Sequence, residues 1–293
     1  MENEVYGAID IGSNAARLLI VEVYRVDSQV YYKKRSLVRV PLRLGEEVFA
    51  EGRIPPHKEE DLKKSMAAYK NLLEVNKAVS YKAVATSAMR DAQNGQAIAN
   101  RIERETGIKI EIIKGMEEAR LLFATHFEEL LEVDRSYLYI DVGGGSTELS
   151  LFVNGEIQAL KSFNIGTIRL AKGHIEPERW DSMKDWIKKE TANTGQIEGI
   201  GSGGNINKLY KLTGSRIDKK ISREEMAVIY SKLDGLSNIE RITTLGMRGD
   251  RADVILPATQ IFLRVMQWAN CNEIYVPKFG LSDGIVRTLA EKK

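Results

Sequence analysis

Two stretches of the chain place apolar and small residues in the same order. Residues 8–14 read Ala-Ile-Asp-Ile-Gly-Ser-Asn and residues 139–145 read Tyr-Ile-Asp-Val-Gly-Gly-Gly, and the two aspartates are offset by 131 residues. In each stretch an apolar strand ends at the aspartate, small residues form a turn, and a second apolar strand follows over 18–24 or 149–153. A repeat offset by close to half the chain predicts a duplicated structural unit.

Further signals of the duplication follow each pair of strands. Asn154-Gly155 is a strong signal for a two-residue hairpin turn, so a third strand is predicted just beyond it. Each copy later reaches a similar tripeptide, Leu42-Arg43-Leu44 in the first and Ile168-Arg169-Leu170 in the second. The similarity between the halves therefore extends beyond the two glycine-containing turns.

Helical patterns come after each set of strands. Apolar residues spaced by three and four predict one helix face, at Leu62, Met66, Tyr69 and Leu73. A second helix is predicted over 118–131, and Ser222-Arg223-Glu224-Glu225 is a capping box that opens a third. A short strand over 84–87 is predicted to lead into a loop at Arg90-Asp91.

The order of these elements predicts an α/β protein of two lobes that face each other across a cleft. A length of 293 residues agrees with about two domains. The first lobe is predicted to span 1–125 and the second 126–293, with the return of the last helix to the first lobe as an alternative.

Composition excludes several classes of protein. Lys plus Arg is 43 and Asp plus Glu is 41, which leaves a net charge of +2 and argues against a dedicated nucleic-acid binder. The single cysteine, Cys271, excludes an internal disulfide framework and a Cys-rich zinc module. No secretory signal and no apolar run of about 18 residues is visible, so a cytoplasmic protein without a membrane segment is expected.

The turn at Asp10-Ile11-Gly12-Ser13-Asn14 places an acid at a strand end beside small residues. Successive backbone N–H groups, together with Ser13 and Asn14, are suited to bind phosphate oxygens. The alternative is an aspartate that hydrogen-bonds its own turn. This turn by itself leaves both interpretations open.

The turn over 141–148 is more specific. Three glycines between two strands weaken a sheet, which is explained by close approach of the backbone to a ligand. A loose hairpin turn would not explain why Asp141 and Glu148 bracket the glycines, nor the matching turn in the other half. Taken together, the two turns predict a phosphate clamp.

Other motifs carry less information. Residues 199–204 satisfy G-x-G-x-x-G, but no βαβ unit with an acid after its second strand follows, so a strand-to-helix turn is predicted instead. The three histidines are too scattered for metal-ligand spacing, at positions His57, His126 and His174. Glu117 and Glu118 open a helix; they either complement the helix dipole or one of them orients a water molecule.

Two Asp-Gly phosphate turns on duplicated α/β halves resemble the actin, hexokinase and heat-shock-protein ATPase superfold. Within it, the chain is similar to the exopolyphosphatase and guanosine pentaphosphate phosphatase family. The similar segments run in order along nearly the whole chain: 10–14, 85–90 with Asn94, 115–120, 141–148, 166–170, 201–204, and Gly280-Leu281 with Gly284. The resemblance implies two ribonuclease-H-like, actin-like lobes with a central interlobe cleft.

The resemblance also implies roles for individual residues. Glu118 matches the catalytic base, Arg90 an arginine near the phosphate tail, and Asp141 and Glu148 acids that hold a metal or orient water. The phosphate-binding residues are then Ser13, Asn14, Gly143, Gly144, Gly145 and Ser146. Asp141, Glu148 and Asp10 are the predicted ligands of Mg²⁺, or of Mn²⁺.

The implied activity is removal of terminal phosphate from inorganic polyphosphate by metal-assisted attack of water. The sibling activity is hydrolysis of pppGpp to ppGpp. The resemblance also leaves open a phosphotransferase and a non-catalytic sensor of polyphosphate or (p)ppGpp. The expected partners are these phosphate compounds and neither nucleic acid nor membrane, and a homodimer is an open assembly state. Ala15, Asn205 and Ser282-Asp283 depart from the family pattern.

Overall fold

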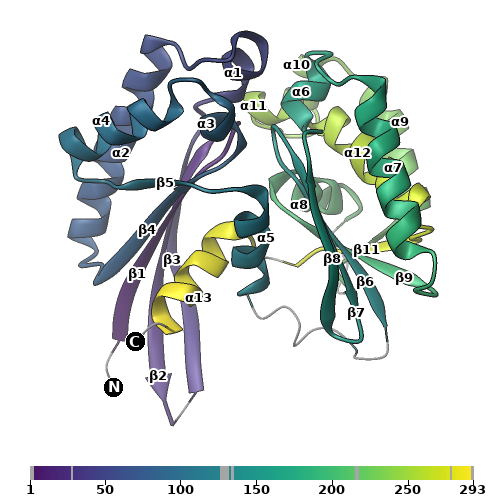
Figure 1. Cartoon of the computed structure of the whole chain (residues 1–293), viewed down its shortest axis with the longest axis horizontal. Helices are drawn as coiled ribbons and strands as arrows, with labels where there is room; N and C mark the ends of the chain where they lie inside the picture. The colour runs from purple at the N-terminus through teal and green to yellow at the C-terminus, as the bar shows by residue number, and fades with distance from the viewer. Residues whose placement is uncertain are drawn as a thin grey trace. The chain divides into compact units, whose positions relative to one another are not determined.

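A computed structural model describes residues 3–27, 29–125, 132, 135–214, 218–277 and 279–291. The chain divides into two compact units (Figure 1). Unit 1 comprises Met1–Thr125 together with Gly280–Lys293, and unit 2 comprises His126–Phe279. The final helix therefore belongs to unit 1.

Unit 1 is built on a mixed five-stranded sheet of order β3-β2-β1-β4-β5. Its strands are β1 (Asn3–Ile11), β2 (Ala16–Val26), β3 (Gln29–Val40), β4 (Ser80–Ala85) and β5 (Ile110–Ile112). Strands β1, β2 and β3 pair antiparallel, whereas β4 lies parallel to both β1 and β5. Its helices are α1 (Gly45–Glu51), α2 (Pro56–Val75), α3 (Ser87–Asp91), α4 (Gly95–Thr106), α5 (Gly115–Phe123) and α13 (Leu281–Glu291).

Helix α2 packs the predicted apolar face against the sheet of unit 1. Leu62, Met66, Tyr69 and Leu73 are all buried, which confirms the prediction from their spacing. The Tyr69 hydroxyl donates to the carbonyl oxygen of Ala16 over 3.0 Å, so its polar end is satisfied inside the core. Burial raises the pKa of Tyr69 to about 12.

Helix α13 contacts β1, β2, β4 and α5 of unit 1 (Figure 1). Arg25 Nη2 donates to the carbonyl oxygen of Ala290 over 2.8 Å, and the Arg287 guanidinium lies 4.6 Å from the centre of the Tyr32 ring. Lys34 Nζ lies 2.7 Å from Asp283 Oδ1. Residues far apart in the sequence thus fasten the last helix to the first three strands.

Unit 2 repeats the same arrangement around a six-stranded sheet of order β10-β11-β9-β6-β7-β8. Its strands are β6 (Ser136–Val142), β7 (Thr147–Val153), β8 (Glu156–Phe163), β9 (Ile197–Ser202), β10 (Lys220–Ser222) and β11 (Glu273–Tyr275). Strands β6, β7 and β8 are antiparallel, and β9 is parallel to β6 and β11. Its helices are α6 (Thr167–Ala171), α7 (Pro177–Thr191), α8 (Gly204–Leu212), α9 (Arg223–Asp234), α10 (Asn238–Thr243), α11 (Gly249–Ala252) and α12 (Ile255–Trp268).

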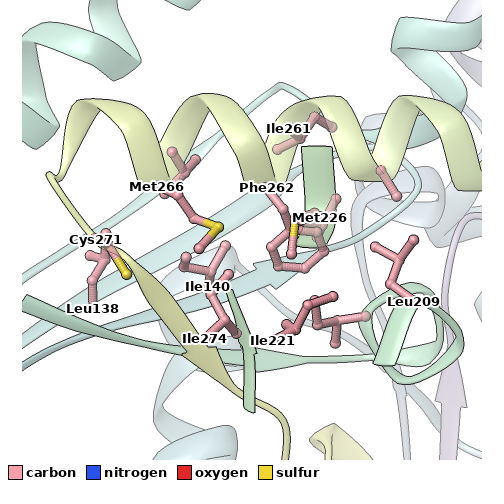
Figure 2. Packing of buried hydrophobic residues seen from close by; sticks show 14 of the residues in the cluster. Leu138, Ile140, Leu209, Ile221, Met226, Ile261, Phe262, Met266, Cys271 and Ile274 are labelled. Atoms are coloured by element: carbon pink, nitrogen blue, oxygen red, sulfur yellow. The ribbon is translucent and has the colours of Figure 1, made fainter. Parts of the chain in front are cut away.

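The core of unit 2 lies between α12 and its sheet. Figure 2 shows Phe262 and Met266 of α12 directed toward Ile140 of β6 and Ile274 of β11, all four fully buried. Cys271 lies in the same cluster, and burial raises the pKa of its thiol to about 11. This thiol is therefore protonated at neutral pH and packs as a small apolar group.

Several local predictions are confirmed. Asn154 and Gly155 have φ angles of 54° and 79°, as a two-residue hairpin turn between β7 and β8 requires. Ser222 accepts from the Glu225 amide and Glu225 accepts from the Ser222 amide, which completes the predicted capping box of α9. The turn after β9 leads directly into α8, as predicted for 199–204.

Two predicted elements differ from the structure. The predicted loop at Arg90-Asp91 is wrong, because both residues lie in α3, which begins two residues after the end of β4. The helix predicted over 118–131 begins earlier, at Gly115, and is described to Phe123. Of its predicted apolar stripe, His126 and Leu130 and the side chain of Leu122 lie outside the described residues.

The helices were also searched for a membrane-spanning segment. No helix in the described ranges is long and apolar enough to cross a membrane.

Candidate active site

The first glycine-containing turn joins β1 to β2 in unit 1. The Gly12 amide donates to the carbonyl oxygen of Ala15 over 3.1 Å and closes the turn. The Ser13 carbonyl accepts from the Gly45 amide over 2.9 Å, and the Asn14 carbonyl accepts from the Arg43 amide over 3.0 Å. The start of α1 therefore holds the carbonyl side of the turn.

The second turn, between β6 and β7 in unit 2, has the same construction. The Gly143 amide donates to the Ser146 carbonyl over 2.9 Å. The start of α6 then binds three successive carbonyl oxygens of the turn. Gly143 accepts from the Thr167 amide (3.0 Å), Gly144 from the Ile168 amide (2.9 Å) and Gly145 from Arg169 Nε (2.8 Å).

These contacts fix the orientation of the peptide groups in the second turn. With its carbonyls held by α6, the N–H groups of Gly144 and Gly145 find no acceptor in the part of the chain that the structure describes. Consecutive N–H groups of this kind form an anion-binding concavity. A Cβ at Gly166 would lie 2.4 Å from the Gly144 oxygen, so only glycine lets α6 approach this closely.

The closing hydrogen bonds show the duplication at the level of single atoms. Gly12 and Gly143 donate, and Ala15 and Ser146 accept, each pair being 131 residues apart. The predicted phosphate-binding residues Ser13 and Asn14 are thus the structural counterparts of Gly144 and Gly145. The tripeptides at 42–44 and 168–170 correspond too, since both brace a turn from the start of a helix.

A row of polar residues crosses the sheet of unit 2 beside the second turn. Asp141 of β6 lies opposite Glu148 of β7 and opposite Ser202 of β9, and Glu148 lies opposite Ser162 of β8. Residues directly opposite each other on paired strands point to the same sheet face. The row therefore gathers two carboxylates and two hydroxyls on one face.

Two serines orient the Glu148 carboxylate within this row. Glu148 is only 2% exposed, and its Oε1 accepts from Ser146 Oγ over 2.7 Å and from Ser162 Oγ over 2.8 Å. Hydroxyl donors compensate part of the cost of burying a carboxylate. Ser146 was predicted to bind phosphate; in this structure its hydroxyl is held by Glu148.

Unit 1 has a corresponding row with different charges. Asp10 lies opposite Arg17, and Arg17 lies opposite Arg39. Asp10 is 4% exposed, and its Oδ2 lies 2.7 Å from Arg17 Nη1. The carboxylate of Asp10 is thus neutralised by a cation from its own sheet, and its predicted metal-binding role stays a prediction.

The other predicted residues of unit 1 lie on or beside short helices. Ser13 Oγ lies 2.9 Å from Ser87 Oγ at the start of α3. Arg90, also on α3, donates from Nη1 to the carbonyl oxygen of Ile113 over 3.3 Å. Glu118 occupies the first turn of α5 and is half-buried. The catalytic roles of Arg90 and Glu118 stay predictions.

Sequence reasoning missed residues that support these groups. Asn94 lies in one of the family-like segments, and its side chain accepts from the Ile54 amide (3.0 Å) and donates to the Ile54 carbonyl (2.8 Å). Arg169 also lies in such a segment, without a predicted role. Ser162 and Ser202 join the polar row only through strand register, for which the sequence contained no signal beyond their location near strand ends.

The row in unit 2 fits a divalent cation of the Mg²⁺ type. Mg²⁺ is commonly held by one or two carboxylates, with waters and substrate phosphates completing its shell. Asp141 and Glu148 supply two carboxylates on adjacent strands, and no group of three or more His, Cys, Asp or Glu gathers among the described residues. A buried hydroxyl without a protein partner, on Ser202, lies in the same row.

Comparison with known proteins gives consistent results. The model of the Ppx/GppA phosphatase family matches residues 23–293. Exopolyphosphatase 1 of Mycobacterium tuberculosis (strain ATCC 25618 / H37Rv) is 24% identical over 307 residues, covering 96% of this chain and 86% of that protein. Exopolyphosphatase 2 of the same strain is 27% identical over 320 residues, covering 97% and 98%.

A solved structure has the same fold. The crystal structure of an exopolyphosphatase from Cytophaga hutchinsonii ATCC 33406 superposes with a TM-score of 0.83 at 24% identity, covering 99% of this chain and 98% of that one. The predicted fold class, α/β with two duplicated units, is confirmed by this likeness and by the two mixed sheets.

Proposed function

Because the chain belongs to the Ppx/GppA phosphatase family, we propose that it hydrolyses the terminal phosphoanhydride bond of inorganic polyphosphate. The observation that supports this most directly is the second glycine turn. Its carbonyls are held by α6, its N–H groups of Gly144 and Gly145 point away from them, and Asp141 and Glu148 flank it.

The residues of unit 2 would bind the charged end of the substrate. The N–H groups of Gly144 and Gly145 would donate to oxygens of the terminal phosphate, because phosphoryl transfer depends mainly on positioning and on stabilising charge. Asp141 and Glu148 would hold the cation. When bound, Mg²⁺ supplies neutralisation of the phosphate oxygens and of the developing charge.

The residues of unit 1 would assist attack by water. Glu118 would accept a proton from the water molecule as its oxygen bonds to the terminal phosphorus. The bond from that phosphorus to the bridging oxygen breaks, and the electron pair stays on the shortened polyphosphate. Arg90 would neutralise negative charge along the phosphate tail. The products are inorganic phosphate and a chain shorter by one phosphate.

Hydrolysis of pppGpp to ppGpp is the second candidate, since the matching family includes both kinds of phosphatase in its description. The glycine turn contacts phosphate groups alone, so the same machinery serves either substrate. Two buried or half-buried acids beside the turn favour hydrolysis over a sensor, which would need only the binding groups.

The test is phosphate release from polyphosphate and from pppGpp, side by side, with and without Mg²⁺. Glu118→Gln should lower turnover by about 10²- to 10⁴-fold, the usual contribution of a general base. Glu117→Gln is the matched control on the same helical turn and should stay near wild type. Wild-type protein that binds but does not hydrolyse either compound would contradict the proposal and favour a sensor; phosphate transfer to ADP would favour the phosphotransferase.

A further inference from the structure

Ser202, the last residue of β9, carries a buried hydroxyl that no protein group satisfies. The residue is 1% exposed, and its Oγ has no hydrogen-bond partner among the described residues. Leaving a buried hydroxyl unsatisfied costs free energy, whereas alanine in its place would avoid that cost. A group outside the polypeptide therefore accounts best for a serine here.

Strand register places this hydroxyl beside the two acids. Ser202 is the partner of Asp141 across β9 and β6, and Asp141 is the partner of Glu148 across β6 and β7. The three side chains therefore share one face of the sheet on three adjacent strands. Their spacing is that of neighbouring strands, about 4.8 Å, which suits joint contact with a single small ligand.

The backbone after Ser202 also leaves room next to Asp141. Gly203 has a φ of 95°, which favours glycine, and a Cβ at that position would lie 3.2 Å from Asp141 Oδ1. The Asp141 carboxylate thus reaches toward the carboxyl end of β9, where Ser202 lies. A side chain at 203 would obstruct the space between them.

The other serines of the row are satisfied differently. Ser146 and Ser162 both donate to Glu148 Oε1, and so they serve to orient that carboxylate. Ser202 makes no such contact. Its oxygen is therefore available as a lone-pair donor, the property required of a ligand to a hard cation.

We propose that Ser202 Oγ is an oxygen ligand of the divalent cation held by Asp141 and Glu148. The site would combine two carboxylates and one hydroxyl from β6, β7 and β9, and waters or substrate phosphates would complete the shell. The identity of the cation as Mg²⁺ rests on the proposed function, whereas the oxygen ligand set rests on the sheet register.

The first experiment measures binding of Mn²⁺ alone, by electron paramagnetic resonance of the free ion during titration. Ser202→Ala should weaken Mn²⁺ binding by about tenfold, in the range found when groups supporting a metal site are lost. Ser136→Ala is the matched control. Ser136 lies at the other end of β6 and donates to the Thr194 carbonyl over 3.0 Å, so its loss should leave the affinity unchanged.

The second variant, Ser202→Cys, tests direct ligation. Sulfur is a soft ligand, so the affinity for Cd²⁺ relative to Mn²⁺ should rise at least about tenfold over the wild-type ratio. A ratio equal to that of Ser202→Ala would overturn direct ligation. Unchanged Mn²⁺ affinity in Ser202→Ala would overturn the proposal as a whole.

Thermal unfolding gives a readout that a structural role would move in the opposite direction. Without divalent cations, Ser202→Ala should melt at the wild-type temperature or above it, because an unsatisfied group is removed. With Mn²⁺, the wild type should gain more in Tm than the variant. A metal-free variant that melts well below wild type would show that the hydroxyl stabilises the fold itself and would overturn the proposal.

Failure here and failure of the proposed function are distinguishable. An enzyme that hydrolyses polyphosphate with Ser202-independent Mn²⁺ affinity would refute the ligand assignment alone. A protein without hydrolase activity whose Mn²⁺ affinity depends on Ser202 would refute the hydrolase alone.

Discussion

The two polar rows of the protein share one backbone plan and differ in charge. In unit 1, Asp10 faces Arg17 on the neighbouring strand and forms an ion pair of 2.7 Å. In unit 2, Asp141 faces Glu148 at the same position of the hairpin. Both pairs are separated by seven residues, and both turns are closed by the same amide-to-carbonyl hydrogen bond.

The difference shows how a duplicated scaffold acquires two chemistries. Opposite charges directly across a strand pair stabilise a sheet, whereas like charges there destabilise it. The row of unit 1 is therefore stable by itself. The row of unit 2 brings two carboxylates together, and a divalent cation relieves their repulsion. One residue per unit, Arg17 or Glu148, decides which situation holds.

Removing the second acid of unit 2 is expected to have the largest effect. Glu148→Gln should lower metal-dependent phosphate release by about 10²- to 10³-fold, the usual loss when one preorganised electrostatic group is removed, and should weaken Mn²⁺ binding. Steady-state kinetics and Mn²⁺ titration check this. Glu156→Gln, on the exposed start of β8 in the same hairpin, is the control; equal losses in both variants would refute the special role of Glu148.

Breaking the charge pair of unit 1 should affect stability next most strongly. Arg17→Met leaves the buried Asp10 carboxylate without its cation, so the free energy of unfolding should fall by about 2 kcal/mol. Urea denaturation measures this. Adding Asp10→Asn should recover part of the loss, as contacting residues are not additive. Strict additivity of the two changes would show that the pair does not stabilise unit 1.

A bulkier residue at the brace of the second turn tests whether its peptide orientation matters. Gly166→Ala places a Cβ about 2.4 Å from the Gly144 oxygen, so the turn must shift, at a cost of about 1–2 kcal/mol in unfolding free energy. KM for polyphosphate should rise severalfold, since the N–H groups turn with the peptides. Gly235→Ala, where the nearest atom is at 3.7 Å, should change neither quantity appreciably.

Cys271 provides a smaller effect that reports on unit 2 alone, because the chain has one cysteine. Its pKa is raised from 9.0 to about 11 by burial. The unfolded state therefore loses its proton first as pH rises, and stability that is complete below pH 9 should be lost toward pH 11. Between pH 8 and pH 10 the loss should be about 1 kcal/mol more than in Cys271→Ala. Parallel pH profiles of unfolding would contradict this.

The sequence alone determined the features whose signals are local. Alternation and small residues located both phosphate turns, and the spacing of Leu62, Met66, Tyr69 and Leu73 located the buried face of α2. Asn154-Gly155 determined its hairpin, because the left-handed backbone there favours these residues. Such signals depend on a few neighbouring residues, so they survive without knowledge of the fold.

The tertiary structure alone decided which residues share a face of the polar rows. Ser202 lies 61 positions after Asp141 in the chain yet is its partner across β9 and β6, and Ser162 joins Glu148 through β8. The placement of α13 in unit 1, against strands from the other end of the chain, is likewise non-local. Strand register and crossover connections arise from the packing of whole units, and a shift of one residue would move every side chain of a strand to the opposite face.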